Sequence, residues 1–505
     1  MKHLYLAAII LIKFILQFVL VHPDYDLQRD EYLHLDQGLH LAWGYLSVPP
    51  MTSWISFFIQ LVGPSELWVR FVPALFGAMT LVLTWKMIEK LNGGLFACVL
   101  GTTAMLISPL LRINILYQPN SLDVFFWTLA FYVLLRWIQT NEPRWIYMMA
   151  LTFALGIYSK YNILFLMAGI LPALLITTQR KIFANKHLYI AMGLGVVLVF
   201  PNLLWQLKNH LPMLHHFREL AETQLVNMSR MDFMKDQFIY FINSFFIIIA
   251  AFTGFCFYPP FKPYRVIALT YLFTISLFLF FKAKSYYPFG LYPVLMAFGA
   301  VYIIQLTQSG WKKILRPVSL SLVVVLAIPL FMIGFPNKRP EQIKQHPELY
   351  QFFGLLRWED GKDHAIPQDF SDMLGWSELA EKVDAVYDTI QNQEQTLVLC
   401  DNYGEAGAIN YYSRHKNINA VSFNADYINW FPLDKPILNV IAIKDSDSAE
   451  EEINGTAPLF HSAYRAGAIE NPDAREFGTT ILVFEGAKEN INALVSKEIA
   501  EEKSR

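Results

Sequence analysis

The amino-acid sequence predicts a polytopic α-helical membrane protein with a soluble α/β domain at its C-terminal end. Of the 505 residues, 54% are hydrophobic and only 16% are charged, whereas soluble domains carry about 25% charged residues. Residues 1–335 contain 24 Lys and Arg against 13 Asp and Glu, and residues 336–505 contain 16 against 29. A Pro-flanked polar break at 336–340 separates the two parts. We therefore expect one domain over 1–335 and another over 336–505.

The first part contains about eleven apolar runs, with a range of ten to thirteen, near the length of roughly 20 residues that crosses a bilayer. Their centres are Ile12, Leu75, Met105, Leu129, Met149, Phe165, Val196, Ile247, Ile275, Leu295 and Val325. The first run is long for a signal peptide and lacks a small-residue cleavage site, so we expect it to remain as an anchor. The runs near Met149 and Phe165 are short and share the interruption at 159–162.

The loops indicate an orientation. If the N-terminus is cytoplasmic, every inner loop is basic, and the positive-inside rule favours that arrangement. The inner basic residues are then Lys86, Lys90, Arg136, Arg144, Arg180, Lys181, Lys186, Lys262, Arg265, Lys312, Lys313 and Arg316. Of the 13 carboxylates in this part, only Glu89 and Glu142 fall inside. We expect a multi-pass protein of the cell (inner) membrane, with 336–505 extracytoplasmic and the working face outside.

The C-terminal part reads as a small soluble α/β domain. Residues 376–391 form an amphipathic helical pattern, and TLVLC, AVSF, PILNVIAI and TTILVFE read as strands. The run DNYGEAGAINYYS reads as a loop and a helix. We find no phosphate loop, nucleophile elbow or metal-ligand spacing in this part, so we expect a binding or capping role.

Three carboxylates of the membrane part are catalytic candidates. Asp30 and Glu31 directly follow the first apolar run. Adjacent carboxylates there can act as a general base and as a cation or hydroxyl ligand, and a solvated loop pair is the alternative. Asp123 lies just before Phe125, and a charge so close to hydrocarbon is usually functional.

Cations and aromatic residues near the outer ends of the runs are binding candidates. A lipid phosphate needs fixed cations at the membrane surface. The cations are Lys284, Lys282, Arg70, Arg112 and, at the interruption, Lys160. The side chains that could bind a sugar are Tyr161, Tyr286, Tyr287, Trp205 and Gln206. Interface anchoring, or pairing within a loop, is the alternative for each.

Six segments follow the Asp30-Glu31 pair in an order that resembles a known family. They are GYLSVPP, LWVRFVPALFGA, YQPNSLDVFFW, GIYSKYN, FPNLLWQLKNHLP and KAKSYYPFGLYP. Together they resemble the family 39 glycosyltransferases of the GT-C fold, which include the protein O-mannosyltransferases and the lipid A aminoarabinose transferase. The resemblance covers about residues 1–335, and DNYGEAGAINYYS is similar to the outer domain of bacterial members.

The resemblance implies a transmembrane glycosyltransferase domain that moves a sugar from a polyprenyl-phosphate donor to a lipid, glycan or protein hydroxyl. Transfer would occur on the outer face with inversion, Asp30 acting as general base and Glu31 orienting it or holding a cation. Many members have a charged residue before the Pro-Pro of the second motif, where this chain has Ser47 and Val48. That departure leaves the requirement for a divalent metal ion open.

Two other classes of protein compete with the enzyme. A transporter or flippase for a lipid-linked substrate usually has repeats and ionisable residues at mid-membrane, whereas here these residues cluster at one face. A membrane-anchored sensor would leave the polar outer loops without a purpose. We expect the sugar donor, membrane lipids and an envelope acceptor as partners, and no nucleic acid.

Overall fold

The structure is a computed structural model that describes residues 2–223 and 225–503. The chain separates into two compact units, which we name the helical unit and the sheet unit. The helical unit comprises Met1–Leu20, Ala42–Thr52 and Ser65–Phe335. The sheet unit comprises Val21–Leu41, Ser53–Pro64 and Pro336–Arg505. The sheet unit is therefore assembled from three separate stretches of the chain.

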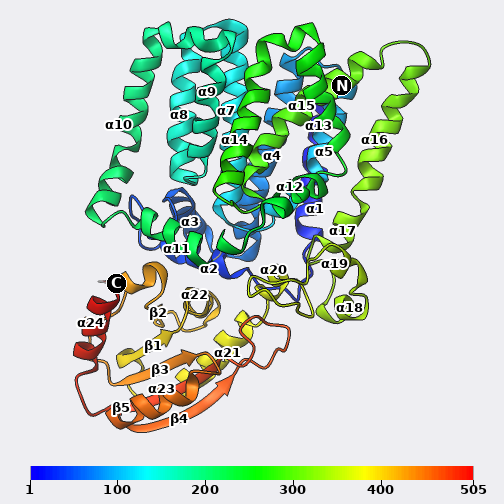
Figure 1. The fold of residues 1–505 in the computed structure, drawn as a ribbon. Helices are drawn as coiled ribbons and strands as arrows, with labels where there is room; N and C mark the ends of the chain where they lie inside the picture. The colour runs from blue at the N-terminus through cyan, green and yellow to red at the C-terminus, as the bar shows by residue number, and fades with distance from the viewer. Residues whose placement is uncertain (1, 224, 504–505) are drawn as a thin grey trace. The chain divides into compact units, whose positions relative to one another are not determined.

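The helical unit is an α-helical bundle (Figure 1). Its α-helices are α1 (Lys2–Val19), α4 (Glu66–Lys90), α5 (Leu95–Leu106), α6 (Pro109–Ile113), α7 (Pro119–Thr140), α8 (Pro143–Ser159), α9 (Ile163–Leu175), α10 (Lys186–Lys208), α11 (Pro212–Thr223), α12 (Arg230–Tyr240), α13 (Phe245–Phe257), α14 (Arg265–Phe280), α15 (Tyr292–Leu306), α16 (Leu315–Leu326) and α17 (Ile328–Ile333). Short 3-10 helices are η1 (Thr178–Ala184), η2 (Leu225–Asn227), η3 (Pro259–Tyr264), η4 (Tyr287–Leu291) and η5 (Gly310–Ile314). The centre of every predicted apolar run falls inside one of these helices.

The number of membrane spans differs from the number of apolar runs. Among the described residues, 7 helices are long and apolar enough to cross a membrane. The number rises to 9 if two bent pairs, α9 with η1 and α12 with α13, each form one span. Two of the predicted spans are shorter, since α5 has 12 residues and α8 has 17. The polytopic architecture is confirmed, and the count of about eleven stays a prediction.

The bundle has a buried centre and apolar outer helices. α15 is buried along almost its whole length and packs against α13, α5 and α4. At Gly299 a side chain would collide with the carbonyl oxygen of Ile247, so the glycine lets α13 approach closely. By contrast, α10 exposes large apolar residues such as Ile190, Val196 and Val197. An apolar surface of this extent is unfavourable in water, and lipid is its natural solvent.

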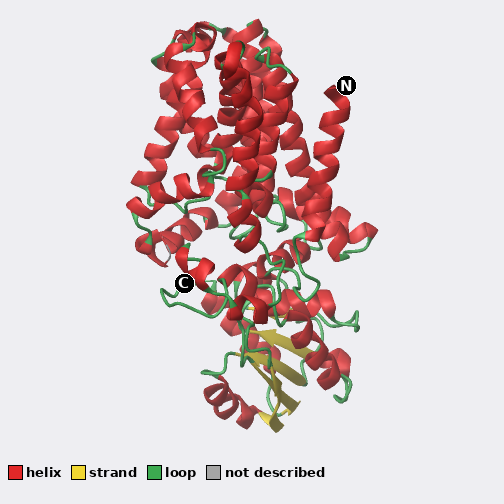
Figure 2. Ribbon diagram, turned by 90° about the vertical axis from the view of Figure 1, so that its right-hand side faces the viewer, coloured by secondary structure: helices red, strands yellow, loops and turns green. Residues whose placement is uncertain are grey.

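The sheet unit combines one five-stranded sheet with short helices (Figure 2). Its strands are β1 (Thr396–Cys400), β2 (Ala420–Ser422), β3 (Asn439–Lys444), β4 (Phe460–Ala468) and β5 (Thr480–Ala487). Its helices are α2 (Arg29–Gln37), most of α3 (Met51–Val62), α18 (Pro340–Gln345), α19 (Glu348–Phe352), α20 (Gln368–Ser371), α21 (Trp376–Tyr387), α22 (Tyr403–Tyr412), α23 (Ala449–Thr456) and α24 (Ile491–Glu502), with the 3-10 helices η6 (Gln393–Gln395), η7 (Ala425–Asn429) and η8 (Ala457–Leu459). The predicted α/β class is confirmed.

The sheet has the strand order β2-β1-β3-β5-β4. β1 pairs in parallel with both β2 and β3, whereas β5 is antiparallel to β3 and to β4. The four expected strands are all present, and β4 is an additional edge strand. The sequence did not predict β4 because most of its residues are exposed and they show no apolar alternation.

Candidate active-site residues in the two units

Asp30 and Glu31 lie in the first turn of α2, in the sheet unit. Gln28 caps this helix: its side-chain oxygen accepts a hydrogen bond from the Asp30 N–H at 2.9 Å. The Gln28 N–H in turn donates to Oε2 of Glu31 at 2.6 Å. Glu31 is 0% exposed, whereas the Asp30 side chain is 36% exposed. Asp30 can therefore be reached by a substrate, and Glu31 stabilises the start of the helix that carries it.

The C-terminal part of the chain holds the Asp30 carboxylate in place. The Tyr403 hydroxyl, in the first turn of α22, donates a hydrogen bond to Oδ1 of Asp30 at 2.6 Å. The Arg29 guanidinium lies 5.1 Å from the centre of the Tyr403 ring, and its Nε lies 3.9 Å from the same Asp30 oxygen. A short hydrogen bond to a carboxylate is among the stronger kinds. Tyr403 therefore fixes the direction in which Asp30 points.

The other end of α2 is anchored to the same part of the chain. Oδ2 of Asp36 accepts hydrogen bonds of 2.7 Å from both Asn410 and Tyr427. Nε2 of Gln37 donates to Asp426 at 2.8 Å. Burial raises the pKa of Asp36 to about 6, against the lowering effect of its two hydrogen bonds. α2 is thus held at both ends, and Asp30 stands on a rigid element.

Two glycines of α22 allow α2 to pack closely. At Gly404 an added Cβ would collide with the side chain of Arg29. At Gly407 it would lie 2.6 Å from both Cβ of Tyr32 and the Tyr427 hydroxyl. The two positions are three residues apart and so share one face of the helix. The close packing of α22 against α2 therefore explains the two glycines of the run YGEAG.

We expect Gly407→Ala to destabilise the sheet unit by about 1 to 3 kcal/mol, because the extra methyl group overpacks the contact with Tyr32. The measurement is the apparent melting temperature of the purified full chain. Gly455→Ala is the matched control: Gly455 lies in helix α23 with open space around it, and alanine favours a helix by up to about 1 kcal/mol. A Gly407→Ala protein as stable as the control would contradict the role of this contact.

In the helical unit, Lys160 lies at the interruption between α8 and α9. Its Nζ donates a hydrogen bond to Oδ1 of Asn120 at 2.6 Å. It also lies 5.2 Å from the ring centre of Tyr286 and 4.7 Å from that of Tyr287. We call Asn120, Lys160, Tyr286 and Tyr287 the Lys160 cluster. Three of its members were predicted from the sequence, and the structure brings them together.

Asp123 lies beside this cluster in a buried position. Its two oxygens accept hydrogen bonds of 2.8 Å from Trp127 and from Asn162. The same Asn162 amide group donates to the backbone oxygen of Tyr287 at 2.9 Å. Asp123 is only 5% exposed. Asn162 thus connects Asp123 to η4. This geometry suits Asp123 as a residue that positions the Lys160 cluster.

Tyr161 belongs to a neighbouring polar chain. Its hydroxyl accepts a hydrogen bond from Gln206 at 2.9 Å and donates to Asn202 at 3.2 Å, and Asn202 donates to the Trp43 backbone oxygen at 2.7 Å. The ring of Trp205 packs against Gly44, where a side chain would collide with it. Tyr161 and Gln206 are therefore in contact, and Trp205 packs beside another residue of the loop that contains Trp43.

The other four predicted cations also belong to the helical unit. Arg70 is paired with Glu66 at 3.0 Å, one helical turn earlier in α4. Arg112 lies at the end of the short helix α6. Lys282 donates to the backbone oxygen of Val226 at 3.2 Å. Lys284 is partly buried, and its charge interacts with that of Lys160.

This chain is similar to known proteins in both sequence and structure. A family model described as dolichyl-phosphate-mannose-protein mannosyltransferase matches residues 47–205. The crystal structure of ArnT from Cupriavidus metallidurans bound to undecaprenyl phosphate covers 95% of this chain and 98% of its own, with a TM-score of 0.61 and 14% sequence identity. This chain has the GT-C fold of membrane glycosyltransferases. The resemblance inferred from the sequence is thereby confirmed.

This chain is also similar to a second ArnT structure and to a curated relative. The apo crystal structure of the same ArnT matches with a TM-score of 0.61 and 13% identity, over 95% of this chain and 97% of that one. The lipid A galacturonosyltransferase RgtD of Rhizobium johnstonii is 25% identical over 220 residues. That alignment spans 43% of this chain and 46% of RgtD, so the GT-C chain matches less than half of the length of this relative.

Several residues of these sites were not singled out from the sequence. In the sheet unit they are Tyr403, Asn410 and Tyr427, and in the helical unit Asn120 and Asn162. All but Tyr427 lie inside the segments that carry the resemblance. The polar residues within YQPNSLD, GIYSKYN and DNYGEAGAINYYS are therefore the sequence feature that could have pointed to them.

The resemblance to the glycosyltransferase family left open whether a divalent metal ion binds near Asp30. The side chains around Asp30 show which ligands such an ion would find. One oxygen of Glu31 already accepts the Gln28 N–H. Among the residues that the structure describes, Asp30 and Glu31 belong to no group of three metal-ligating side chains. The requirement for a divalent metal ion stays a prediction, and we derive no step through one.

Proposed function

We propose that this protein transfers a sugar from a polyprenyl-phosphate donor to a hydroxyl group of an envelope lipid, glycan or protein on the outer face of the membrane. The observation that carries the proposal is the whole-chain similarity to ArnT, whose crystal structure holds undecaprenyl phosphate. The similarity to a lipid A galacturonosyltransferase supports a lipid-linked acceptor as the first to be tried.

The proposed reaction is a direct displacement at the anomeric carbon. The acceptor hydroxyl gives its proton to the Asp30 carboxylate, and its oxygen forms the new bond to the sugar. The bond between the anomeric carbon and the phosphate oxygen breaks, and polyprenyl phosphate leaves with the bonding electron pair. A single displacement of this kind inverts the configuration, as in inverting glycosidases. The reachable carboxylate of Asp30, directed by Tyr403, suits the part of the base.

The leaving phosphate requires fixed positive charge. Lys284 and Lys160 are the proposed ligands, because their two positive charges interact with each other. A phosphate shared by two lysines offsets their mutual repulsion. Tyr286 and Tyr287 flank Lys160 and limit its access to water. Electrostatic stabilisation of a leaving group is strongest where water is excluded.

We expect the N-terminus to be cytoplasmic and residues 340–505 to be extracytoplasmic. Alkaline-phosphatase and fluorescent-protein fusions made after residue 340 measure this, because the first reporter is active only outside and the second inside. Activity of the phosphatase fusion supports the orientation. Fluorescence with no phosphatase activity would contradict both the orientation and the outer-face reaction.

The proposed function is tested most directly by mass spectrometry of envelope glycolipids and glycoproteins from cells with and without the protein. We expect one class of conjugate to lose a single sugar, and to regain it when the wild-type chain is returned. The Asp30→Asn chain, expressed to the same level, should not restore it. If the envelopes are identical with and without the protein and the purified chain transfers no sugar, the proposed transferase function is wrong.

A further inference from the structure

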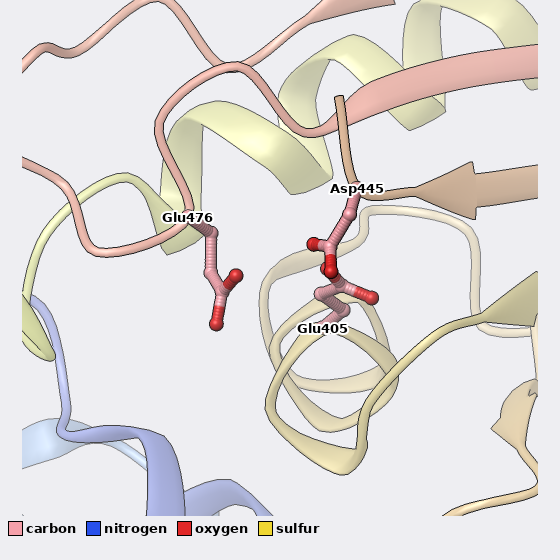
Figure 3. A group of neighbouring side chains, drawn as sticks. All are labelled: Glu405, Asp445 and Glu476. Atoms are coloured by element: carbon pink, nitrogen blue, oxygen red, sulfur yellow. The ribbon is translucent and has the colours of Figure 1, made fainter. Parts of the chain in front are cut away.

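A second group of carboxylates, outside the residues assigned to transfer, lies in the sheet unit (Figure 3). Glu405 comes from α22, Asp445 directly follows β3, and Glu476 lies in the loop between β4 and β5. One oxygen from each of the three lies within 4.8 Å of the others. α22 follows β1, so Glu405 and Asp445 both follow the carboxyl ends of two adjacent parallel strands. Ligands of open α/β sheets bind at this edge.

A second, independent observation at Glu405 also points to a ligand. Its Oε2 accepts hydrogen bonds from the backbone N–H groups of Asp401 at 3.0 Å and Asn402 at 3.2 Å. Its Oε1 is buried and has no hydrogen-bond partner among the described residues. The whole residue is 0% exposed. A buried acceptor that is left unsatisfied costs about 1 to 3 kcal/mol, and more if it is charged.

The basic residues next to the cluster are engaged with other carboxylates. Lys444 pairs with Asp401 at 2.8 Å and with Glu452 at 3.1 Å. Arg475 pairs with Asp372 at 3.0 Å. The three carboxylates converge, so their like charges repel one another, and a shared cation offsets that repulsion.

We propose that Glu405, Asp445 and Glu476 bind a calcium ion. All three ligands are carboxylate oxygens, which hard divalent cations prefer. One oxygen of each lies within 4.8 Å of the others, so the three can reach a single ion. Calcium accepts oxygen ligands in a flexible geometry, whereas magnesium demands a near-ideal octahedron, so calcium suits three carboxylates from separate elements better. Asp445 is exposed, so the ion can enter from solvent, and water completes its coordination.

The ion would join the first turn of α22 to the end of β3 and to the loop before β5, two segments that the pairing of β3 with β5 already brings together. Glu405 lies two residues after Tyr403 in the same turn, so the site stabilises the part of α22 that contacts Asp30. Binding itself does not depend on the proposed transfer reaction, and its test uses no activity assay.

The experiment uses the full chain in detergent, stripped with a chelator and titrated with terbium, a luminescent substitute for calcium. We expect one saturable terbium site per chain, displaced by calcium at lower concentration than by magnesium. Glu476→Gln and Asp445→Asn should each weaken binding about tenfold or more, because the site loses a charged ligand. Binding should also weaken as the pH falls from about 8 to about 5, because protons compete for the same oxygens.

Asp447→Asn is the matched control, since Asp447 is exposed and only two residues from Asp445, and it should bind terbium as the wild type does. Glu405→Gln tests the third ligand, but Glu405 also caps α22, so this variant can fail to fold. In that case Glu476→Gln and Asp445→Asn decide the question. A wild-type chain that binds neither terbium nor calcium at millimolar concentration would overturn the proposal. Unchanged affinity in both Glu476→Gln and Asp445→Asn would overturn it equally.

Discussion

The Asp30→Asn protein is expected to bind a polyprenyl-phosphate sugar normally and to transfer it at least about a hundredfold more slowly than the wild type. A general base that polarises an acceptor hydroxyl typically contributes about 10² to 10⁴ in rate. Asparagine keeps the size of the side chain and can still accept the hydrogen bond from Tyr403, so folding should survive. The measurements are donor binding and single-turnover transfer by the purified full chain.

Three further variants distinguish the base from its surroundings. Tyr403→Phe removes only the hydroxyl that directs Asp30, so kcat should fall while the KM for the donor stays unchanged. Glu31→Gln should reduce transfer less than Asp30→Asn if Glu31 only supports the helix. Asp24→Asn is the control, because Asp24 is an exposed carboxylate a few residues earlier in the sequence, paired with Arg339. Near wild-type transfer by Asp30→Asn would remove Asp30 from the mechanism, and Asp123 would be tested next.

The second large effect is expected for Lys284→Met, which keeps the aliphatic stem and removes the charge. If Lys284 holds the leaving phosphate, the loss of transition-state stabilisation is about 2 to 4 kcal/mol. That corresponds to about 30- to 1,000-fold in kcat/KM. The measurement is the transfer rate over a range of donor concentrations, with expression and gel-filtration behaviour as checks on folding.

Lys160→Met should act in the same direction, and the double variant should lose less than the sum of the two single losses if both lysines contact one phosphate. Lys235→Met is the matched control, since Lys235 is an exposed lysine of the helical unit to which we assign no role. Unchanged turnover of Lys284→Met at every donor concentration would assign Lys284 to anchoring at the membrane interface.

Local patterns were enough to predict most of the elements. The centres of the apolar runs all fall in helices, and α8 and α9 are separated at the interruption that Lys160 marks. The strands β1, β2, β3 and β5 appear where short apolar runs lie between turns. β4 lacked such a pattern because it is an edge strand whose stability comes from pairing with β5, and pairing leaves little trace in a local sequence.

The site was predictable only in part, for a related reason. The carboxylate pair, Lys160 and the two tyrosines were accessible from residue type and position. The hydrogen bond from Tyr403 to Asp30 joins residues 373 positions apart, and the Glu405 cluster gathers residues from three elements. Contacts of this kind depend on tertiary packing, which leaves no periodic pattern in the local sequence. The sequence patterns therefore could not predict them.

The discontinuous sheet unit has a consequence for how the protein is made. α2, with 9 residues, is too short to be stable alone, because isolated helices below about 12 to 15 residues are marginal in water. Its partners in α22 leave the ribosome only after Tyr412 is added, about 20 to 75 s after Gln37 at about 5 to 20 residues per second. A nascent chain interrupted near residue 335 would possess its bundle but no ordered Asp30. A copy whose synthesis stops before α22 is complete therefore lacks the contacts that hold Asp30 in place.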